Sequence, residues 1–122
     1  MTWEVGFHLD FDPEFNDLSK EVQNELLARV KLLEEFGPVL ARPWADTLKG
    51  SNHANMKELR FNVGKGLWRV AFAFDPVRKG VILVADDKRG INEKLFYRRL
   101  IRKADKRFDV YLERLKSERR SK

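Results

Sequence analysis

The chain has 122 residues, 43% of them hydrophobic and 11% aromatic, which suits one compact domain spanning residues 1–122. It contains no cysteine, which excludes a disulfide framework, a thiolate metal site and a cysteine nucleophile, and fits a reducing compartment. The net charge is +6, but residues 1–48 carry 4 basic and 10 acidic side chains, whereas residues 49–122 carry 21 and 9. The basic second part indicates an anionic partner such as nucleic acid, although a solvated surface rich in lysine and arginine would give the same asymmetry.

The N-terminal sequence MTWEVGFHLDFDPEF lacks a basic segment followed by an apolar run, so we expect no signal peptide. No apolar stretch approaches the roughly 20 residues that are needed to span a bilayer. Together with the absence of cysteine, these features predict a cytoplasmic protein with no membrane partner.

The first elements are a strand and a short helix. Residues 2–9 (TWEVGFHL) alternate apolar and polar side chains from Trp3 to Leu9, which is typical of a strand with one buried face. The segment FDPEFNDL predicts a short helix in which Asp12 is the N-cap and Pro13 the first helical residue.

A longer helix follows, with Ser19 as its N-cap and Gly37-Pro38 as its end. Its apolar side chains recur at three- and four-residue spacing, as an amphipathic helix requires. After a loop rich in proline and small polar residues, three strands are predicted at residues 57–63, 67–74 and 81–86. Asn92 then caps a basic helical region at about residues 92–117.

This order of elements, β-α-α-β-β-β-α, predicts an α+β fold. The short connections make the last three strands antiparallel neighbours. We expect an antiparallel sheet with the helices packed on one face and the other face partly open.

The segment NMKELRFNVGKGLWRVAFAF contains the most informative hairpin. If residues 64–65 form a two-residue type II′ loop, Phe61 lies opposite Trp68 on the core face. Arg60 then lies opposite Arg69 on the other face, although opposed like charges destabilise a strand pair. The arrangement makes sense if an anion binds there, because two guanidinium forks suit a phosphate.

Other interpretations of this hairpin stay open. Arg69 could pair with Asp86 on the next strand, and Arg60 with Glu58 or with solvent. A turn that is one residue longer or shorter would also remove the opposition of the two arginines.

Four segments in order resemble the RelE/HigB superfamily of toxins from type II toxin–antitoxin systems, and most closely its phage-related HigB-like branch. The segments are RPWADTLKGSNHANMKELRF, GLWRVAFAFD, ILVADDK and EKLFYRRLIRKAD, and the resemblance extends over about residues 3–112. It implies an α+β, microbial-ribonuclease-like fold. It also implies cleavage of mRNA in the ribosomal A site, without a metal or cofactor, by attack of a 2′-hydroxyl on the adjacent phosphodiester.

Such cleavage needs a base, cations and an acid, and the resemblance implies where to look for them. Arg60 and Arg69 would bind phosphate, and Lys57 and Lys88 would supply further cations. The candidate acid or base residues are His53, whose ordinary pKa suits either role, and Tyr97, which could also stack on a base. RNA contacts are expected from Arg89, Lys94, Arg98 and Arg102.

Each of these residues also has a purely structural interpretation. His53 could be an ordinary loop histidine, Tyr97 could flank the apolar stripe of its helix, and the basic helix could be a solvated face. Some members of the superfamily carry paired lysines on the central strand or a C-terminal end rich in His, Asp and Tyr. This chain ends in the basic helix RRLIRKADKRFDVYLERLK instead, which leaves its acid–base pair open.

Three functions follow from these features. The chain is expected to be an mRNA interferase that inhibits translation. The alternatives are a ParE-like gyrase inhibitor on the same fold, or a non-catalytic nucleic-acid-binding or regulatory module. The resemblance further implies an antitoxin that covers the basic surface with acidic or apolar segments, besides mRNA and the ribosome as partners.

Overall fold

The structure is a computed structural model that describes residues 2–120. Its elements in chain order are β1 (Val5–Phe7), α1 (Phe11–Asp17), α2 (Lys20–Phe36), the 3-10 helix η1 (Gly37–Val39), β2 (Ala45–Thr47), β3 (Lys57–Val63), β4 (Gly66–Phe74), β5 (Gly80–Asp87) and α3 (Glu93–Arg120). The strands form one sheet in the order β1-β5-β4-β3-β2. The predicted α+β class and the three central strands are therefore confirmed.

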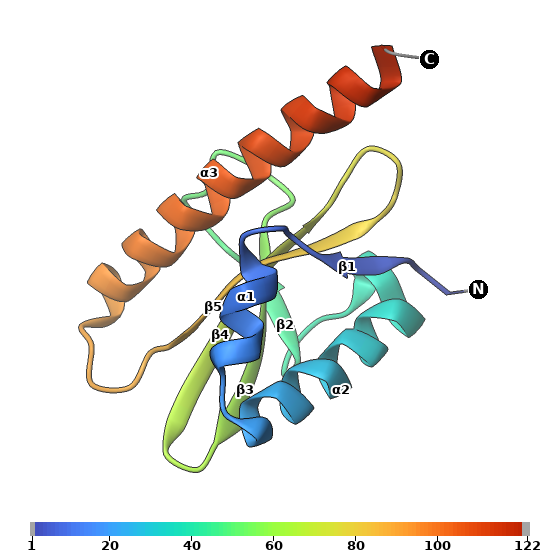
Figure 1. Ribbon diagram of the computed structural model, residues 1–122. Coiled ribbons are helices and arrows are strands. Elements are labelled where there is room, and N and C mark those ends of the chain that lie inside the picture. Colours follow the sequence, from blue (N-terminus) through green and yellow to red (C-terminus); the bar gives the residue numbers. More distant parts are fainter. Residues whose placement is uncertain (1, 121–122) are drawn as a thin grey trace.

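The sheet is covered by helices on both faces, which corrects the prediction of helices on one face (Figure 1). One core joins α1 and α2 to inward residues of β3, β4 and β5, among them Leu59, Phe61, Val70, Phe72 and Ile82. A second core joins α3 to Ala71, Ala73, Val81, Leu83 and Val84. Because β4 and β5 are apolar on both faces along much of their length, each face can bury a helix, and α3 takes the face that was expected to be open.

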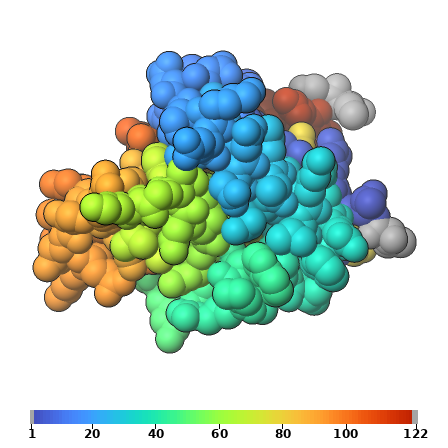
Figure 2. All heavy atoms as spheres, turned by 90° about the horizontal axis from the view of Figure 1, so that it is seen from below, coloured from blue at the N-terminus to red at the C-terminus, as the bar shows by residue number. Residues whose placement is uncertain are grey.

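Figure 2 views the molecule from the side of α1 and α2 (blue to cyan) and shows the hairpin of β3 and β4 (yellow-green) reaching the surface beside α2. The register of this hairpin is as predicted, with Arg60 opposite Arg69 and Phe61 opposite Trp68. Gly64 has a φ of +56°, which the first position of a type II′ turn requires. The two-residue turn, together with the alternating pattern of the strands, therefore accounts for the opposition of the two arginines.

Two strands differ from the prediction. β1 runs parallel to β5, so the sheet is mixed and not purely antiparallel. No hairpin joins these two strands, and their direction is set by the long chain between them. β2 was not predicted, because three residues are too short for an alternating pattern to show, yet they pair antiparallel with the start of β3.

The ends of the helices follow the predicted signals in most places. The Ser19 hydroxyl accepts a hydrogen bond from the Val22 amide at 3.3 Å, and the Asn92 side chain accepts one from the Leu95 amide at 3.1 Å. The prediction for Asp12 was wrong, since α1 begins at Phe11. The chain turns after β1, which ends two residues before Leu9 and leaves that side chain exposed. Within residues 2–120, no helix is both long enough and apolar enough to cross a membrane.

Candidate functional site

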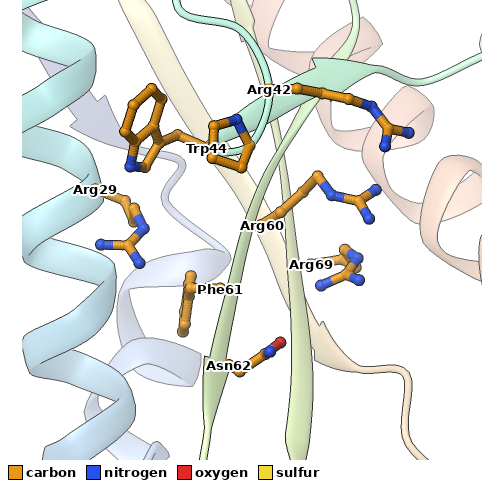
Figure 3. Close-up of a pocket in the computed structure, with 8 residues that line it drawn as sticks. Arg29, Arg42, Trp44, Arg60, Phe61, Asn62 and Arg69 are labelled. Atoms are coloured by element: carbon orange, nitrogen blue, oxygen red, sulfur yellow. The ribbon is translucent and has the colours of Figure 1, made fainter.

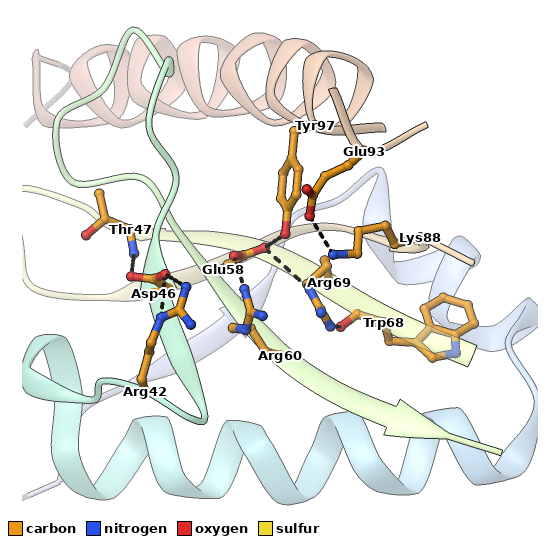
Figure 4. Close-up of polar contacts among 10 residues, drawn as sticks. All are labelled: Arg42, Asp46, Thr47, Glu58, Arg60, Trp68, Arg69, Lys88, Glu93 and Tyr97. Atoms are coloured by element: carbon orange, nitrogen blue, oxygen red, sulfur yellow. Dashed lines mark hydrogen bonds and ion pairs between the residues drawn. The ribbon is translucent and has the colours of Figure 1, made fainter. Parts of the chain in front are cut away.

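A buried carboxylate lies between the two opposed arginines. Glu58 is only 3% exposed. One of its oxygens, Oε2, accepts a hydrogen bond from Arg60 Nη1 at 3.0 Å, and the other, Oε1, accepts one from the Tyr97 hydroxyl at 2.9 Å. Arg69 Nε lies 4.0 Å from Oε1 (Figure 4). Glu58 therefore compensates both guanidiniums, and Arg69 turns to it instead of to Asp86, its cross-strand neighbour on β5.

The two arginines differ in their access to solvent. Arg69 is 6% exposed, and its Nη1 donates to the Trp68 carbonyl at 2.8 Å. Its Nε is buried and has no hydrogen-bond partner in the described part of the chain. The Arg60 side chain is partly exposed, so it can reach a ligand directly, whereas its cross-strand neighbour Arg69 is buried beside it and adds positive charge there.

Tyr97 and Lys88 complete this group of side chains. Burial, and then the Glu58 carboxylate, raise the pKa of Tyr97, so its phenol stays protonated at neutral pH. Lys88 Nζ lies 5.7 Å from the centroid of the Tyr97 ring and donates to Glu93 Oε1 at 2.8 Å, which lowers the pKa of Glu93. We call Glu58, Arg60, Arg69, Lys88 and Tyr97 the Glu58 cluster.

A hollow of about 540 Å³ opens beside the Glu58 cluster, at the edge of β3 beyond β2 (Figure 3). We call it the arginine hollow. Its lining residues are Arg29, Arg42, Pro43, Trp44, Arg60, Phe61, Asn62 and Arg69. Four of the eight are arginines and none is acidic, so the hollow suits an anion with several oxygen atoms.

The carboxylates that accompany these arginines are fewer than the arginines. Arg29 Nη1 lies 3.5 Å from Glu25 Oε2, and Arg42 Nη2 lies 2.7 Å from Asp46 Oδ2. Arg60 and Arg69 share the single carboxylate of Glu58. The hydrogen bond from Arg42 holds the pKa of Asp46 below its usual value. The Nε atom of Arg29 is buried and, like that of Arg69, has no hydrogen-bond partner among the described residues. The four guanidiniums thus retain capacity for an anion.

A second, basic groove runs along α3 and meets the Glu58 cluster at Tyr97. Its lining residues are Lys49, Gly50, Asn52, Lys94, Tyr97, Arg98, Ile101, Arg102 and Asp105. Three of the four residues that were predicted to bind RNA lie here together, namely Lys94, Arg98 and Arg102. The fourth, Arg89, is exposed on the loop after β5, where its Nε lies 4.0 Å from Asp87 Oδ2.

Two of the predicted site residues lie elsewhere. Lys57 Nζ donates to the Pro38 carbonyl at 2.5 Å on the face that carries α2, because residues three apart on a strand point to opposite faces. His53 Nε2 lies 2.7 Å from Asp109 Oδ1, and its ring packs on Phe108. Asp109 is twelve residues from Tyr97 along α3, or about 18 Å at 1.5 Å per residue.

Sequence reasoning missed Arg29 and Arg42. They come from α2 and from the loop before β2, and only the fold brings them to β3. Arg42 stands in the segment RPWADTLK, whose position next to the central strand could have drawn attention to it. Within residues 2–120, no group of three His, Cys, Asp or Glu side chains is placed to hold a metal ion.

Comparisons with known proteins agree with this architecture. Residues 13–109 match the family described as "Phage derived protein Gp49-like". The chain is 41% identical over 98 residues to "Putative toxin HigB2" of Mycobacterium tuberculosis, in an alignment that covers 80% of this chain and 48% of that protein. It is 39% identical over 98 residues to "Putative toxin HigB3" of the same organism, covering 80% and 83%. The chain thus spans about half of one relative and most of the other.

A solved structure of a mutant E. coli toxin RelE in the free state is similar in fold. The TM-score is 0.63 at 13% sequence identity, over 88% of this chain and 98% of that chain. The family match, the two relatives and this fold together identify the group to which the chain belongs. It is a member of the phage-derived Gp49-like family, within the RelE/HigB superfamily of toxin–antitoxin toxins.

Proposed function

We propose that this chain is the toxin of a toxin–antitoxin pair and that it cleaves mRNA at the ribosome. The observation that carries the proposal is the Glu58 cluster, in which a buried carboxylate, a tyrosine hydroxyl and three cations meet between two basic openings. A site that binds a phosphodiester and moves a proton away from a hydroxyl needs these groups.

Arg42, through its exposed fork, and Arg60, through its partly exposed one, bind the scissile phosphate. As the 2′-oxygen attacks, negative charge grows on the non-bridging oxygens. Arg69, the buried cross-strand neighbour of Arg60, stabilises this charge from a site with little access to bulk water. The arginines are already held by Glu58 and Asp46, so little reorganisation is needed when the transition state forms.

The proton of the 2′-hydroxyl passes to the Tyr97 oxygen while the Tyr97 proton passes to Glu58 Oε1, 2.9 Å away. The raised pKa of Tyr97 keeps its hydroxyl protonated at neutral pH, so a phenolate is not available as the base. The Tyr97 oxygen can still accept the 2′-hydroxyl proton, because Glu58 takes the phenol proton in the same step. The new bond joins the 2′-oxygen to phosphorus and the bond to the 5′-oxygen breaks. The Lys88 ammonium, over the Tyr97 ring, protonates the leaving 5′-oxygen.

The basic groove binds the RNA strand that continues from the cleaved phosphate. Lys94, Arg98 and Arg102 present cations along one side of α3, and Tyr97 joins this groove to the Glu58 cluster. Such contacts to the backbone hold RNA without regard to its sequence.

The test is to induce the chain in a bacterial host and map mRNA 5′ ends genome-wide. Arg60→Ala removes the partly exposed guanidinium that is proposed to bind phosphate, and Lys65→Ala, at the exposed tip of the same hairpin, is the matched control. Each variant is first shown to be folded by circular dichroism. New cuts within reading frames are expected for the original chain and for Lys65→Ala, and are expected to disappear for Arg60→Ala.

Other outcomes would decide for other functions. Growth arrest with DNA damage and intact mRNA would contradict the proposal and favour a ParE-like gyrase inhibitor. A folded chain that causes no arrest would favour a non-catalytic binding or regulatory module.

A further inference from the structure

An apolar groove lies next to the arginine hollow, at the end of α2. Its lining residues are Leu32, Phe36, Val39, Leu40, Ala41, Arg42 and Trp44, and its volume is about 470 Å³. Phe36, Val39 and Trp44 are 47%, 79% and 43% exposed. Within residues 2–120, eight large apolar side chains are exposed, and three of them gather in this groove. Clustered apolar exposure of this kind marks an interaction surface.

The apolar groove continues into the arginine hollow, because Arg42 and Trp44 line both. Arg42 is the one charged residue of the apolar groove, and its side chain is 68% exposed. In Figure 3, Trp44 lies on the side of Arg29, whereas Arg42 extends on the side of Arg60 and Arg69. A ligand that fills the apolar groove with apolar side chains and extends beyond it therefore enters the arginine hollow and meets its four guanidiniums.

The apolar groove and the adjoining arginines together restrict the kind of molecule that can cover this surface. A second copy of the chain docked symmetrically on this face would place two arginine hollows, neither of them lined by an acidic residue, in one interface, and the repulsion between like charges would oppose it. A polypeptide segment with large apolar side chains followed by a carboxylate satisfies both parts of the surface.

We propose that the antitoxin seats such a segment in the apolar groove and extends an Asp or Glu side chain over Arg42 into the arginine hollow. The apolar side chains supply affinity by covering Phe36, Val39 and Trp44. The carboxylate takes the place of an RNA phosphate, so a bound antitoxin blocks the site. The assignment of the partner rests on the toxin family, and the blocking role rests on the proposed function.

The test uses the purified antitoxin, taken as the product of the neighbouring gene that restores growth when it is produced with this chain. Its affinity is measured by calorimetry for the original chain, for Val39→Glu and for Val77→Glu. Val77 is also more than half exposed but lies in the turn between β4 and β5, so it is a matched control. Val39→Glu is expected to weaken binding at least tenfold, since it places a charge in the apolar contact, while Val77→Glu is expected to leave it unchanged.

The same variants separate this inference from the proposed function. Val39→Glu is expected to arrest growth as the original chain does, yet to escape neutralisation by the antitoxin. Equal affinity for Val39→Glu and Val77→Glu would overturn the inference whether or not the chain cleaves mRNA. So would a failure of every neighbouring gene product to bind. A dimer of the chain alone that Val39→Glu dissociates, measured by light scattering, would assign the groove to a second copy.

The blocking role has its own readout. A short single-stranded RNA is titrated into the Tyr97→Phe variant with and without bound antitoxin, and fluorescence anisotropy reports RNA binding. The antitoxin is expected to reduce RNA affinity at least tenfold. Unchanged RNA affinity in the complex would show that the groove binds the antitoxin without covering the arginine hollow, and would overturn the blocking role.

Discussion

Glu58 faces two guanidiniums and one phenol hydroxyl at once, and each of its oxygens has a partner. Arg60 and Arg69 are direct cross-strand neighbours. The Arg60 amide donates to the Trp44 carbonyl on the side away from β4, so this pair is of the non-hydrogen-bonded kind, in which side chains lie closest. Without the carboxylate, the two charges would repel within the sheet.

A double-mutant cycle at Glu58 and Arg69 measures this compensation. Glu58→Gln should lower the free energy of unfolding by about 3 kcal/mol, because it leaves a buried guanidinium without its counter-charge. Arg69→Met in the Glu58→Gln background should recover part of that loss, since it removes the uncompensated charge at similar volume. Urea unfolding of the four proteins gives the coupling energy. Additive effects, with coupling below about 0.5 kcal/mol, would show that Arg69 does not depend on Glu58.

At this scale, the sequence predicts part of the site. The turn residues predict that Arg60 lies opposite Arg69, and the alternative pairing of Arg60 with Glu58 is the one that the structure contains. The burial of Arg69 was not predictable, because it depends on α3 covering a face that was expected to be open. Lys57 was misplaced for a reason visible in the sequence, since it is three residues from Arg60 on one strand.

At the scale of elements, one ion pair joins α1 to α3 beside β5. Arg107 on α3 donates to both carboxylate oxygens of Glu14 on α1, at 2.9 and 2.5 Å, and to the Leu83 carbonyl on β5 at 2.6 Å. The hydrogen bond from Arg107 lowers the pKa of Glu14 from its usual 4.5. The stabilisation is therefore fully present above that value and is lost as the pH falls through the lower value in the folded state.

Replacing Glu14 tests this link between α1 and α3. Glu14→Gln should lower the free energy of unfolding at pH 7 by about 1 to 2 kcal/mol, a value reduced by the partial exposure of the carboxylate. The difference from the original chain should shrink as the pH falls from 5 to 3. Glu35→Gln, at an exposed glutamate of α2, is the matched control and should change little. A difference for Glu14→Gln that stays constant over this pH range, in urea unfolding, would contradict the assignment.

Elements with strong local signals were predictable, and pairings set by distant parts of the chain were not. The hairpin of β3 and β4 follows from two turn residues and an alternating pattern, and the caps of α2 and α3 from single side chains. The parallel pairing of β1 with β5 joins segments more than seventy residues apart in sequence, and no local pattern reports it. α3 packs on the second face because β4 and β5 are apolar on both sides. The alternating apolar and polar residues of β3 had indicated a sheet with only one buried face.

At the scale of the whole molecule, basic side chains from both parts of the chain surround the Glu58 cluster. The basic groove on α3 and the arginine hollow at the edge of β3 both adjoin the Glu58 cluster. The two openings together give a positively charged path on either side of the proposed cleavage point, whereas an evenly solvated basic surface would give no such convergence.

The salt dependence of RNA binding measures the contribution of the basic groove. The triple variant Lys94→Gln, Arg98→Gln and Arg102→Gln should reduce the slope of log affinity against log salt by about 2, because each contact to a single-stranded phosphate contributes about 0.7. The control removes as many charges from the same helix beyond the groove, at Arg114, Arg119 and Arg120. A short RNA is titrated at several salt concentrations, with Tyr97→Phe in all proteins to prevent cleavage. Equal slopes for the two triple variants would contradict a role for the groove.

The measurement that tests the central claim most directly is the rate and chemistry of cleavage on ribosomes programmed with a defined mRNA. The original chain should leave a 2′,3′-cyclic phosphate and a 5′-hydroxyl, since the 2′-oxygen is the nucleophile. Tyr97→Phe, which keeps the ring but removes the hydroxyl between Glu58 and the substrate, should cut about 10² to 10⁴ times more slowly with unchanged RNA affinity. Cleavage by Tyr97→Phe at the original rate, or ends that carry a 3′-hydroxyl and a 5′-phosphate, would contradict the account.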